Sequence, residues 1–462
     1  MNKVSTFSLA LLLSLAFLHL PREGRSQPVN SSGWKAGAAR VAITPQQSMW
    51  MAGFAVRTHA SEGMLHELWA KALALEDGEG KRAVLVTADL LGFPKGMSDR
   101  IRNQLQERFG LGRAQIALNC SHSHSGPVLE HALYDIYPLD DEHLAKIISY
   151  SRELEEKIIT LVGEALEALS PARVYARNGV TRFQVNRRNN NEGELLSQTE
   201  LKGPNDYAVP VIRVTDISGK TVAIAFGYAC HPTVLDQYQW SGDYPGFAQM
   251  ELESAHQGVT ALFFQGAGGD QNPMPRRSVA LARQFGRELA AAVDRVLEEE
   301  MPELMPTLSF AYGEVDLVLD NPPTVQELLQ IRNDPPSWPD RWAARQLDAR
   351  KRGEPVINSY PYPIQAWKLG DQVVLFLGGE LVVEYANDFK RLFGHDIFVA
   401  GYTNDVMAYI PSETILKEGG YEGADSQMVY GLPSLWKTGI QSMIMQEMQR
   451  LALEAGIVPK DH

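Results

Sequence analysis

Two histidines lie two residues apart in the segment Asn119–Pro127, which reads NCSHSHSGP. His122 and His124 stand between a hydrophobic run, IALNC, and a Gly-Pro pair that ends regular structure. A neutral imidazole nitrogen is a good ligand for zinc and other divalent transition metals. An isolated His-x-His pair is more often structural than metal-binding, so the spacing by itself leaves both interpretations open.

Four further polar residues also follow strand-like hydrophobic runs. His231 follows AIAFGYAC, Asp270 follows ALFFQGAGG, Glu380 follows VVLFLGG, and Tyr409 follows DIFVAGYTNDVMA. Ligand crevices of open α/β sheets form at strand ends, so these residues are expected to converge. Two or three histidines and a carboxylate from different strand ends would form a divalent-metal site. The Gly266–Asp270 loop lacks the Lys-Ser/Thr ending of a phosphate-binding P-loop.

The elements that must position these residues alternate along the chain. Strand-like runs occupy residues 83–93, 115–120, 259–265 and 373–377, and residues 209–230 read as two strands joined at Ser218-Gly219. Helical spacing covers residues 97–109, 141–169, 243–256, 278–299 and about 433–455. We therefore predict an α/β protein with a central mixed sheet, helices packed on it and the site at strand ends. Residues 186–203 are predicted to form an exposed loop.

The composition bounds the class of protein and its compartment. The chain has 462 residues and a net charge of −13 at pH 7, and it has no basic stripe, which argues against nucleic-acid binding. Lys3, the apolar run Phe7–Leu20 and the small residues Gly24 and Ser26 are typical of a signal peptide. We predict a signal peptide at residues 1–26, with a membrane anchor as the alternative, and a single domain at residues 27–462. The protein would then be secreted or periplasmic, without a transmembrane segment.

Cys120 and Cys230 are the only cysteines, and both adjoin histidines of these motifs. An exported protein can join such a pair in a disulfide. Two buried free thiols are the simpler interpretation.

The order of the motifs adds information that no single motif carries. The chain contains, in sequence, NCSHSHSGP, ACHPTVLD, SGDYPG, FFQGAGGDQNP, LGGE, NDVMAYIPSE and GYEGADS, preceded by AGAARVAITP, MAGFA and LHELWAKALALED. This set resembles the N-terminal catalytic domain of the neutral, non-lysosomal ceramidase family, from about Gly37 to about Ser426.

The resemblance implies one zinc ion per chain and a set of roles. The family's ligands correspond to His122, His231, Glu380 and Tyr409, with Tyr402 as the alternative tyrosine. His124 would face the substrate or the metal's water, or else support a ligand. Other positions that the resemblance places at or near the site include Asp270, Arg187 and His66. Arg187 is otherwise a solvated loop arginine, and His66 is otherwise a core histidine.

Two departures from the family pattern bear on the chemistry. Ceramidases carry Gly-Asp-x-Ser-Pro, whereas this chain has Asn272 in place of the serine, and asparagine cannot act as a hydroxyl nucleophile. The family's C-terminal β-sandwich domain does not follow in this sequence. We expect an exported zinc-dependent hydrolase that cleaves an amide (N-acyl) or related acyl bond of a small or lipid-like substrate with metal-activated water. Asn272 and the amides of the Gly266–Asp270 loop would stabilise the oxyanion.

Two alternatives remain open from the sequence. One is a metal-containing binding module on the same scaffold that does not catalyse a reaction. The other is a hydrolase directed at an ester or a glycan, because a fold resemblance does not fix the substrate.

Overall fold

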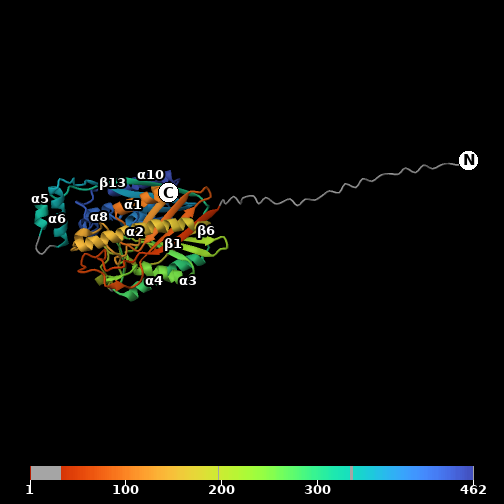
Figure 1. Cartoon of the computed structure of the whole chain (residues 1–462), viewed down its shortest axis with the longest axis horizontal. Helices are drawn as coiled ribbons and strands as arrows, with labels where there is room; N and C mark the ends of the chain where they lie inside the picture. Colours follow the sequence, from red (N-terminus) through yellow and green to blue (C-terminus); the bar gives the residue numbers. More distant parts are fainter. Residues whose placement is uncertain (2–32, 196, 333–336, 461–462) are drawn as a thin grey trace. The chain divides into compact units, whose positions relative to one another are not determined.

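The computed structural model describes Met1 and residues 33–195, 197–332 and 337–460 (Figure 1). Apart from Met1, the predicted signal peptide at residues 1–26 lies outside these ranges. Residues 33–460, gaps aside, belong to one compact unit. A search of the described residues finds no helix with the length and hydropathy needed to cross a bilayer.

The larger sheet has eight strands in the order β11–β9–β8–β6–β1–β3–β4–β5. Its β4 and β5 are parallel, as are β9 and β11, and the other neighbours are antiparallel. The sheet is therefore mixed, as predicted. Its strands are β1 (Trp34–Ala42), β3 (Trp69–Glu76), β4 (Arg82–Ala88), β5 (Ile116–Cys120), β6 (Ser170–Val180), β8 (Ala208–Asp216), β9 (Thr221–Tyr228) and β11 (Thr260–Gln265).

A second sheet of four strands has the order β13–β14–β15–β17. Its strands are β13 (Leu308–Val318), β14 (Ser359–Leu369), β15 (Gln372–Leu377) and β17 (Phe398–Ala400). Three short ladders form outside the two sheets: β2 (Gly63–Met64) with β10 (Gln239–Trp240), β7 (Gln184–Asn186) with β12 (Gln271–Pro273), and β16 (Glu380–Leu381) with β18 (Tyr409–Ile410).

The described residues form ten α-helices, most of which pack on the outer faces of the two sheets, while the two at residues 325–331 and 338–351 form a small core of their own. The ten helices are α1 (Lys95–Phe109), α2 (Asp141–Glu167), α3 (Asp243–Ala255), α4 (Val279–Glu298), α5 (Val325–Ile331), α6 (Trp338–Lys351), α7 (Val383–Phe393), α8 (Glu413–Glu418), α9 (Ser426–Val429) and α10 (Ile440–Glu454). A π-helical turn, Tyr421–Asp425, precedes α9. Figure 1 shows α3 and α4 at one edge of the view and α10 and β13 at the opposite edge.

The two sheets and the helices form four layers, because the side chains of a strand point alternately to the two faces of its sheet. In β4, Val84 and Val86 join the core under α1 and α2, whereas Ala83 and Leu85 join the core shared with the second sheet. This alternation with a period of two residues is that of a strand buried on both faces. Other strands of the larger sheet pack against α3 and α4, and α7 and α10 pack on the second sheet. The order of layers is therefore helix, sheet, sheet, helix.

The predicted α/β class is confirmed, and most predicted helix and strand bounds agree within a few residues. Two expectations were less accurate. The last helix begins at Ile440 rather than near Pro433. The segment 186–203 is not simply an exposed loop, because Asn186 and Asn190 are buried and donate their side-chain amides to backbone carbonyls.

Candidate metal centre

The two outermost strands of the larger sheet are joined at the site by one side chain. Asn119, in β5, accepts a hydrogen bond through Oδ1 from the backbone N–H of Gln265 at the end of β11, at 2.8 Å. Its Nδ2 donates to the carbonyl of Gly401, also at 2.8 Å. This bridge brings the loop after β5 beside the loop after β11, and His231 follows β9, the parallel neighbour of β11.

The short parallel ladder of β16 and β18 supplies two more groups to the same place. Glu380 and Tyr409 are direct partners in its register. The chain reaches Glu380 through Gly379, which has φ +66°, and a Cβ there would lie 2.5 Å from Cγ1 of Ile410. Glycine therefore allows the close turn that presents the glutamate next to the tyrosine.

The side chains of these strand ends converge around one carboxylate oxygen. Oε2 of Glu380 lies 3.1 Å from Nε2 of His122 and 2.9 Å from Nε2 of His231. The hydroxyl of Tyr409 lies 3.2 Å from Nε2 of His231. Nε2 of His124 lies 3.2 Å from Nε2 of His122, and ring nitrogens of the three histidines all fall within 4.8 Å of one another. All five residues are buried.

Hydrogen bonds made by Nδ1 fix the tautomers of His122 and His231. Nδ1 of His122 lies 2.7 Å from the carbonyl of Leu91, and Nδ1 of His231 lies 2.6 Å from the carbonyl of Gly268. A carbonyl oxygen only accepts, so each Nδ1 carries the proton and donates it. In the neutral rings, both Nε2 atoms then present lone pairs to the Glu380 carboxylate.

The charge state of the cluster agrees with this reading. Burial, together with the nearby Arg187 guanidinium, lowers the pKa of His231 to about 4. Burial also lowers the pKa of His124 well below its usual value, with the neighbouring His122 and His231 acting in the same direction. Burial acts to raise the pKa of Glu380, but the adjacent His122 and His231 outweigh it and hold that pKa well below its usual value. At neutral pH the site therefore holds the Glu380 carboxylate beside the neutral rings of His124 and His231.

This donor set fits a divalent cation. Oε2 of Glu380 is buried and has no hydrogen-bond donor among the described residues, although two imidazole nitrogens lie within about 3 Å. Lone pairs that face one another at this distance repel unless a cation lies between them. Imidazole nitrogens and a carboxylate oxygen are ligands that zinc accepts in a four-coordinate site.

Tyr409 and Tyr402 are the two candidates for the tyrosine ligand. The Tyr409 hydroxyl contacts His231 and accepts from Nη2 of Arg187 at 3.0 Å. The ring of Tyr402 packs on His122, with centroids 4.5 Å apart, but its buried hydroxyl has no partner among the described residues. The Tyr409 hydroxyl therefore lies within hydrogen-bonding distance of a cluster histidine, whereas no such contact is found for the Tyr402 hydroxyl among the described residues.

Two residues that the sequence did not single out support the cluster, Tyr430 by a direct contact and Glu422 through Arg187. The hydroxyl of Tyr430 donates to Oε1 of Glu380 at 2.5 Å, and so orients the carboxylate with Oε2 toward the histidines. Glu422, in the π-helical turn, accepts from Nε of Arg187 at 2.7 Å and from Nη1 of Arg188 at 2.7 Å. Glu422 lies in the GYEGADS motif, whose composition does not indicate that its glutamate binds Arg187 and Arg188.

Arg187 links the cluster to Asn272. Its guanidinium contacts Glu422, Tyr409 and, through Nη1 at 3.3 Å, Oδ1 of Asn272. Oδ1 of Asn272 faces a donor, so its Nδ2 is left free, and Nδ2 makes no hydrogen bond within the described residues. Asn272 borders an open, mostly polar cleft of about 560 Å³ that Arg187 also lines.

Asp270 joins the start of α7 to the end of β7 rather than facing the cluster. Its Oδ1 accepts from the backbone N–H of Val383 at 2.9 Å, and its Oδ2 accepts from Nδ2 of Asn186 at 2.8 Å. Its backbone carbonyl accepts from the N–H of Arg187. Both carboxylate oxygens therefore have partners, and the structure places Asp270 as a positioning residue.

His124 approaches the cluster because a glycine leaves room for its ring. Gly53, in the MAGFA segment, has φ +102°, and a Cβ there would lie 2.4 Å from Nδ1 of His124. His66 lies elsewhere, where its Nε2 pairs with the hydroxyl of Ser241 at 2.9 Å. The structure thus brings together His124 and the four predicted ligands but leaves His66 outside them.

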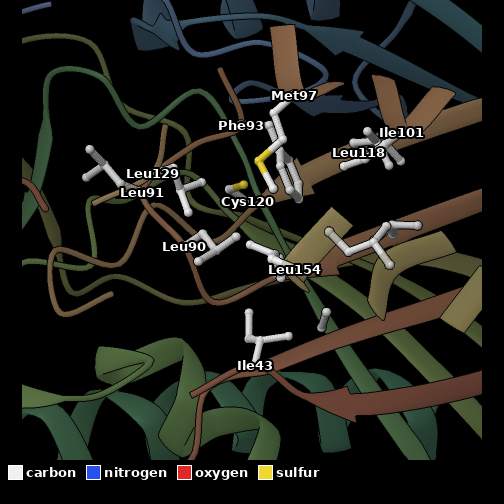
Figure 2. Close-up of a cluster of buried hydrophobic side chains, with 14 of the residues drawn as sticks. Ile43, Leu90, Leu91, Phe93, Met97, Ile101, Leu118, Cys120, Leu129 and Leu154 are labelled. Carbon is white, nitrogen blue, oxygen red and sulfur yellow. The ribbon is translucent and has the colours of Figure 1, made fainter. Parts of the chain in front are cut away.

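Both cysteines are free thiols buried in separate hydrophobic cores. Figure 2 shows Cys120 among buried side chains that include Leu90, Phe93 and Met97. Burial raises the pKa of both thiols well above its usual value. The cysteines therefore act as small apolar packing groups in this structure.

Comparison with known protein families matches residues 34–278 to the family described as neutral/alkaline non-lysosomal ceramidase, N-terminal. The match covers more than half of the chain, and the chain belongs to this family.

Individual relatives agree with this family. The chain is 27% identical over 294 residues to neutral ceramidase A of Dictyostelium discoideum, which covers 58% of this chain and 40% of that relative. It is 24% identical over 305 residues to neutral ceramidase of Drosophila melanogaster, with 64% of this chain and 40% of that relative covered. The chain thus spans about two fifths of the length of these relatives.

A solved structure supports the fold. The neutral ceramidase from Pseudomonas aeruginosa superposes with a TM-score of 0.70 at 18% identity, and the match covers 93% of this chain and 75% of that one.

Proposed function

We propose that this chain is an exported zinc-dependent hydrolase of an amide (N-acyl) or related acyl bond. The observation that carries the proposal is the pair of unprotonated Nε2 atoms of His122 and His231 facing a buried oxygen of Glu380. Membership of the ceramidase family supports the choice of an amide bond.

His122, His231, Glu380 and Tyr409 would hold the ion, one per chain. A bound zinc ion supplies Lewis acidity, which polarises a carbonyl and lowers the pKa of water. Tyr430 holds the carboxylate of Glu380 in its orientation, and the carbonyls of Leu91 and Gly268 hold the two ligand rings. Hydrogen bonds of this kind fix the tautomer and the orientation of metal-binding histidines.

Asn272 has no hydroxyl group for nucleophilic attack, and its proposed role is that of a hydrogen-bond donor. Arg187 occupies its Oδ1, so Nδ2 is available to donate to the oxygen on which negative charge develops during attack on the acyl carbon. Arg187 touches both Asn272 and Tyr409 and fixes their relative position. His124 is neutral and next to His122, which suits it to exchange a hydrogen bond with the substrate or with attacking water.

The substrate is proposed to approach through the polar cleft that Asn272 borders. The relatives are named neutral ceramidases, but this chain carries Asn272 where the family resemblance implies a serine. We therefore propose a small or lipid-like N-acyl substrate other than ceramide, cleaved without an acyl-enzyme intermediate.

Asn272 provides the test. The zinc-loaded protein is assayed with a panel of N-acyl and ester substrates beside Asn272→Ala and Asn272→Ser. Loss of one oxyanion donor should lower kcat by about 10²–10³ for Asn272→Ala with no change in bound metal, whereas Asn272→Ser should keep more activity. If the protein turns over none of the substrates, the result would favour the alternative of a binding module that does not catalyse a reaction. A trapped acyl adduct would contradict attack by water.

A further inference from the structure

The cleft beside Asn272 is lined almost entirely by polar side chains. Its volume is about 560 Å³, and among the described residues that line it, only Met274 is apolar. Pockets that bind small molecules are usually lined mainly by apolar and aromatic groups. The alkyl chains of a lipid would find little apolar surface in this cleft, so the lining indicates a hydrophilic ligand.

An ion pair and several hydrogen bonds hold the two sides of the cleft together. Arg276 donates to Oε2 of Glu192 from Nε at 3.0 Å and from Nη2 at 2.6 Å, and the short ladder of β7 and β12 joins the same two chain segments. Asn190 donates to the carbonyls of Asn186 and Lys202 and accepts from the backbone N–H of Lys202. The polar rim is therefore in place before a ligand binds, which lowers the entropic cost of binding.

The arginines of the cleft already have carboxylate partners. Arg276 pairs with Glu192, and Arg187 and Arg188 share the carboxylate of Glu422. An anionic ligand would have to compete with these carboxylates for the guanidinium groups, and it would be repelled by them. An uncharged ligand avoids this competition.

Two carboxamides in the lining have groups left for a ligand. Asn189 is exposed, and its side chain makes no hydrogen bond with the described part of the chain. At the catalytic end of the cleft, Arg187 occupies only Oδ1 of Asn272 and leaves Nδ2 available. A carboxamide both donates and accepts hydrogen bonds, as a hydroxyl group does. A cleft with these groups suits a ligand that carries several hydroxyl groups.

We propose that this cleft binds an uncharged sugar-like group, and that the substrate class of this chain is an N-acylated amino sugar. The inference rests on the proposed amide hydrolysis and names the half of the substrate that lies in the cleft. In an N-acylated amino sugar the hydroxyl groups lie on the amine half, so Asn189 would bind that half while Asn272 contacts the acyl oxygen. Water then adds across the C–N bond: its hydroxyl group goes to the acyl carbon, which leaves as a carboxylic acid, and its proton goes to the nitrogen of the released amino sugar.

The test compares three amides that share a hexanoyl group and differ in the amine half: N-hexanoylglucosamine, N-cyclohexylhexanamide and N-hexanoylglutamate. The zinc-loaded full chain should hydrolyse the glucosamine amide with a kcat/KM at least about tenfold above that of the other two, because each hydrogen bond to a hydroxyl group contributes about two- to tenfold. Asn189→Ala should lower kcat/KM for the glucosamine amide about two- to tenfold and leave that of the cyclohexyl amide unchanged.

Asn358→Ala is the matched control, because Asn358 is also an exposed asparagine and does not line the cleft. It should leave all three rates unchanged.

Hexyl glucoside separates this inference from the proposed hydrolase. It carries a sugar but no amide, so its binding to the full chain, measured by calorimetry, does not depend on turnover. It should bind saturably, and Asn189→Ala should weaken the binding about two- to tenfold. If none of the amides is hydrolysed while this binding is found, the hydrolase is contradicted and the sugar site is supported. The sugar site is overturned if hexyl glucoside does not bind, if Asn189→Ala leaves its binding unchanged, or if the cyclohexyl or glutamate amide is hydrolysed as efficiently as the glucosamine amide.

Discussion

Replacing Tyr430 by phenylalanine tests whether Glu380 is a metal ligand. The Tyr430 hydroxyl donates to Oε1 of Glu380 at 2.5 Å, and this bond leaves Oε2 facing His122 and His231. A hydrogen bond to an ionised group contributes about 1.5–3 kcal/mol. If that energy supports the metal-bound arrangement, its loss should weaken zinc binding about 10–100-fold, the range found when partners of metal ligands are removed.

The assay is a competition titration of zinc against a chelator of known affinity. Tyr150→Phe is the matched control, because the Tyr150 hydroxyl donates to the carbonyl of Ile43 at 2.5 Å in the core under α2. Both variants lose a buried tyrosine hydrogen bond, but only Tyr430→Phe should lose zinc affinity. Equal zinc affinities for Tyr430→Phe and the wild type would refute the assignment of Glu380.

Two further predictions concern activity and pH. Arg187→Lys should lower kcat by about tenfold or more and leave the metal content intact, because one ammonium cannot contact Glu422, Tyr409 and Asn272 together as the guanidinium fork does. Steady-state rates and metal analysis check this, and an unchanged kcat would contradict it. Burial raises the pKa of Asp405 to about 7, so the folded state favours its protonated form. Stability from this group is complete below an unfolded pKa of about 3.9 and is lost as the pH rises through about 7, a change of roughly 4 kcal/mol at most. Asp405→Asn cannot ionise, so urea unfolding of the metal-free protein between pH 5 and 8 should show a smaller decrease in the variant; equal slopes would contradict the prediction.

The sequence was sufficient to predict the fold class and the strand ends at which the polar groups gather. Buried runs such as IALNC mark strands, and the polar residues directly after them had to fall at strand ends. The motif order then indicated which residues to expect together. The hydrophobic pattern did not indicate that the strands divide between two sheets, because a strand buried on both faces has the same pattern in either sheet.

Other features depended on contacts that no local pattern encodes. Tyr430 reaches Glu380 from 50 residues away, after a π-helical turn whose period the sequence does not announce. The last helix begins later than its apolar spacing predicted. Trp436 donates its indole N–H to the carbonyl of Tyr409, and Lys437 donates its backbone N–H to Val318, so this segment pairs with other elements before the helix begins.

Metal analysis of the purified chain tests the central claim most directly. The wild-type protein, dialysed against zinc and then against buffer, should retain one zinc ion per chain, whereas His122→Ala, His231→Ala and Glu380→Ala should each retain far less. His124→Ala should keep its zinc, since His124 contacts His122 but has no contact with Glu380 among the described residues. A wild-type chain without stoichiometric metal, or unchanged zinc in all three ligand variants, would contradict the assignment of a metal centre.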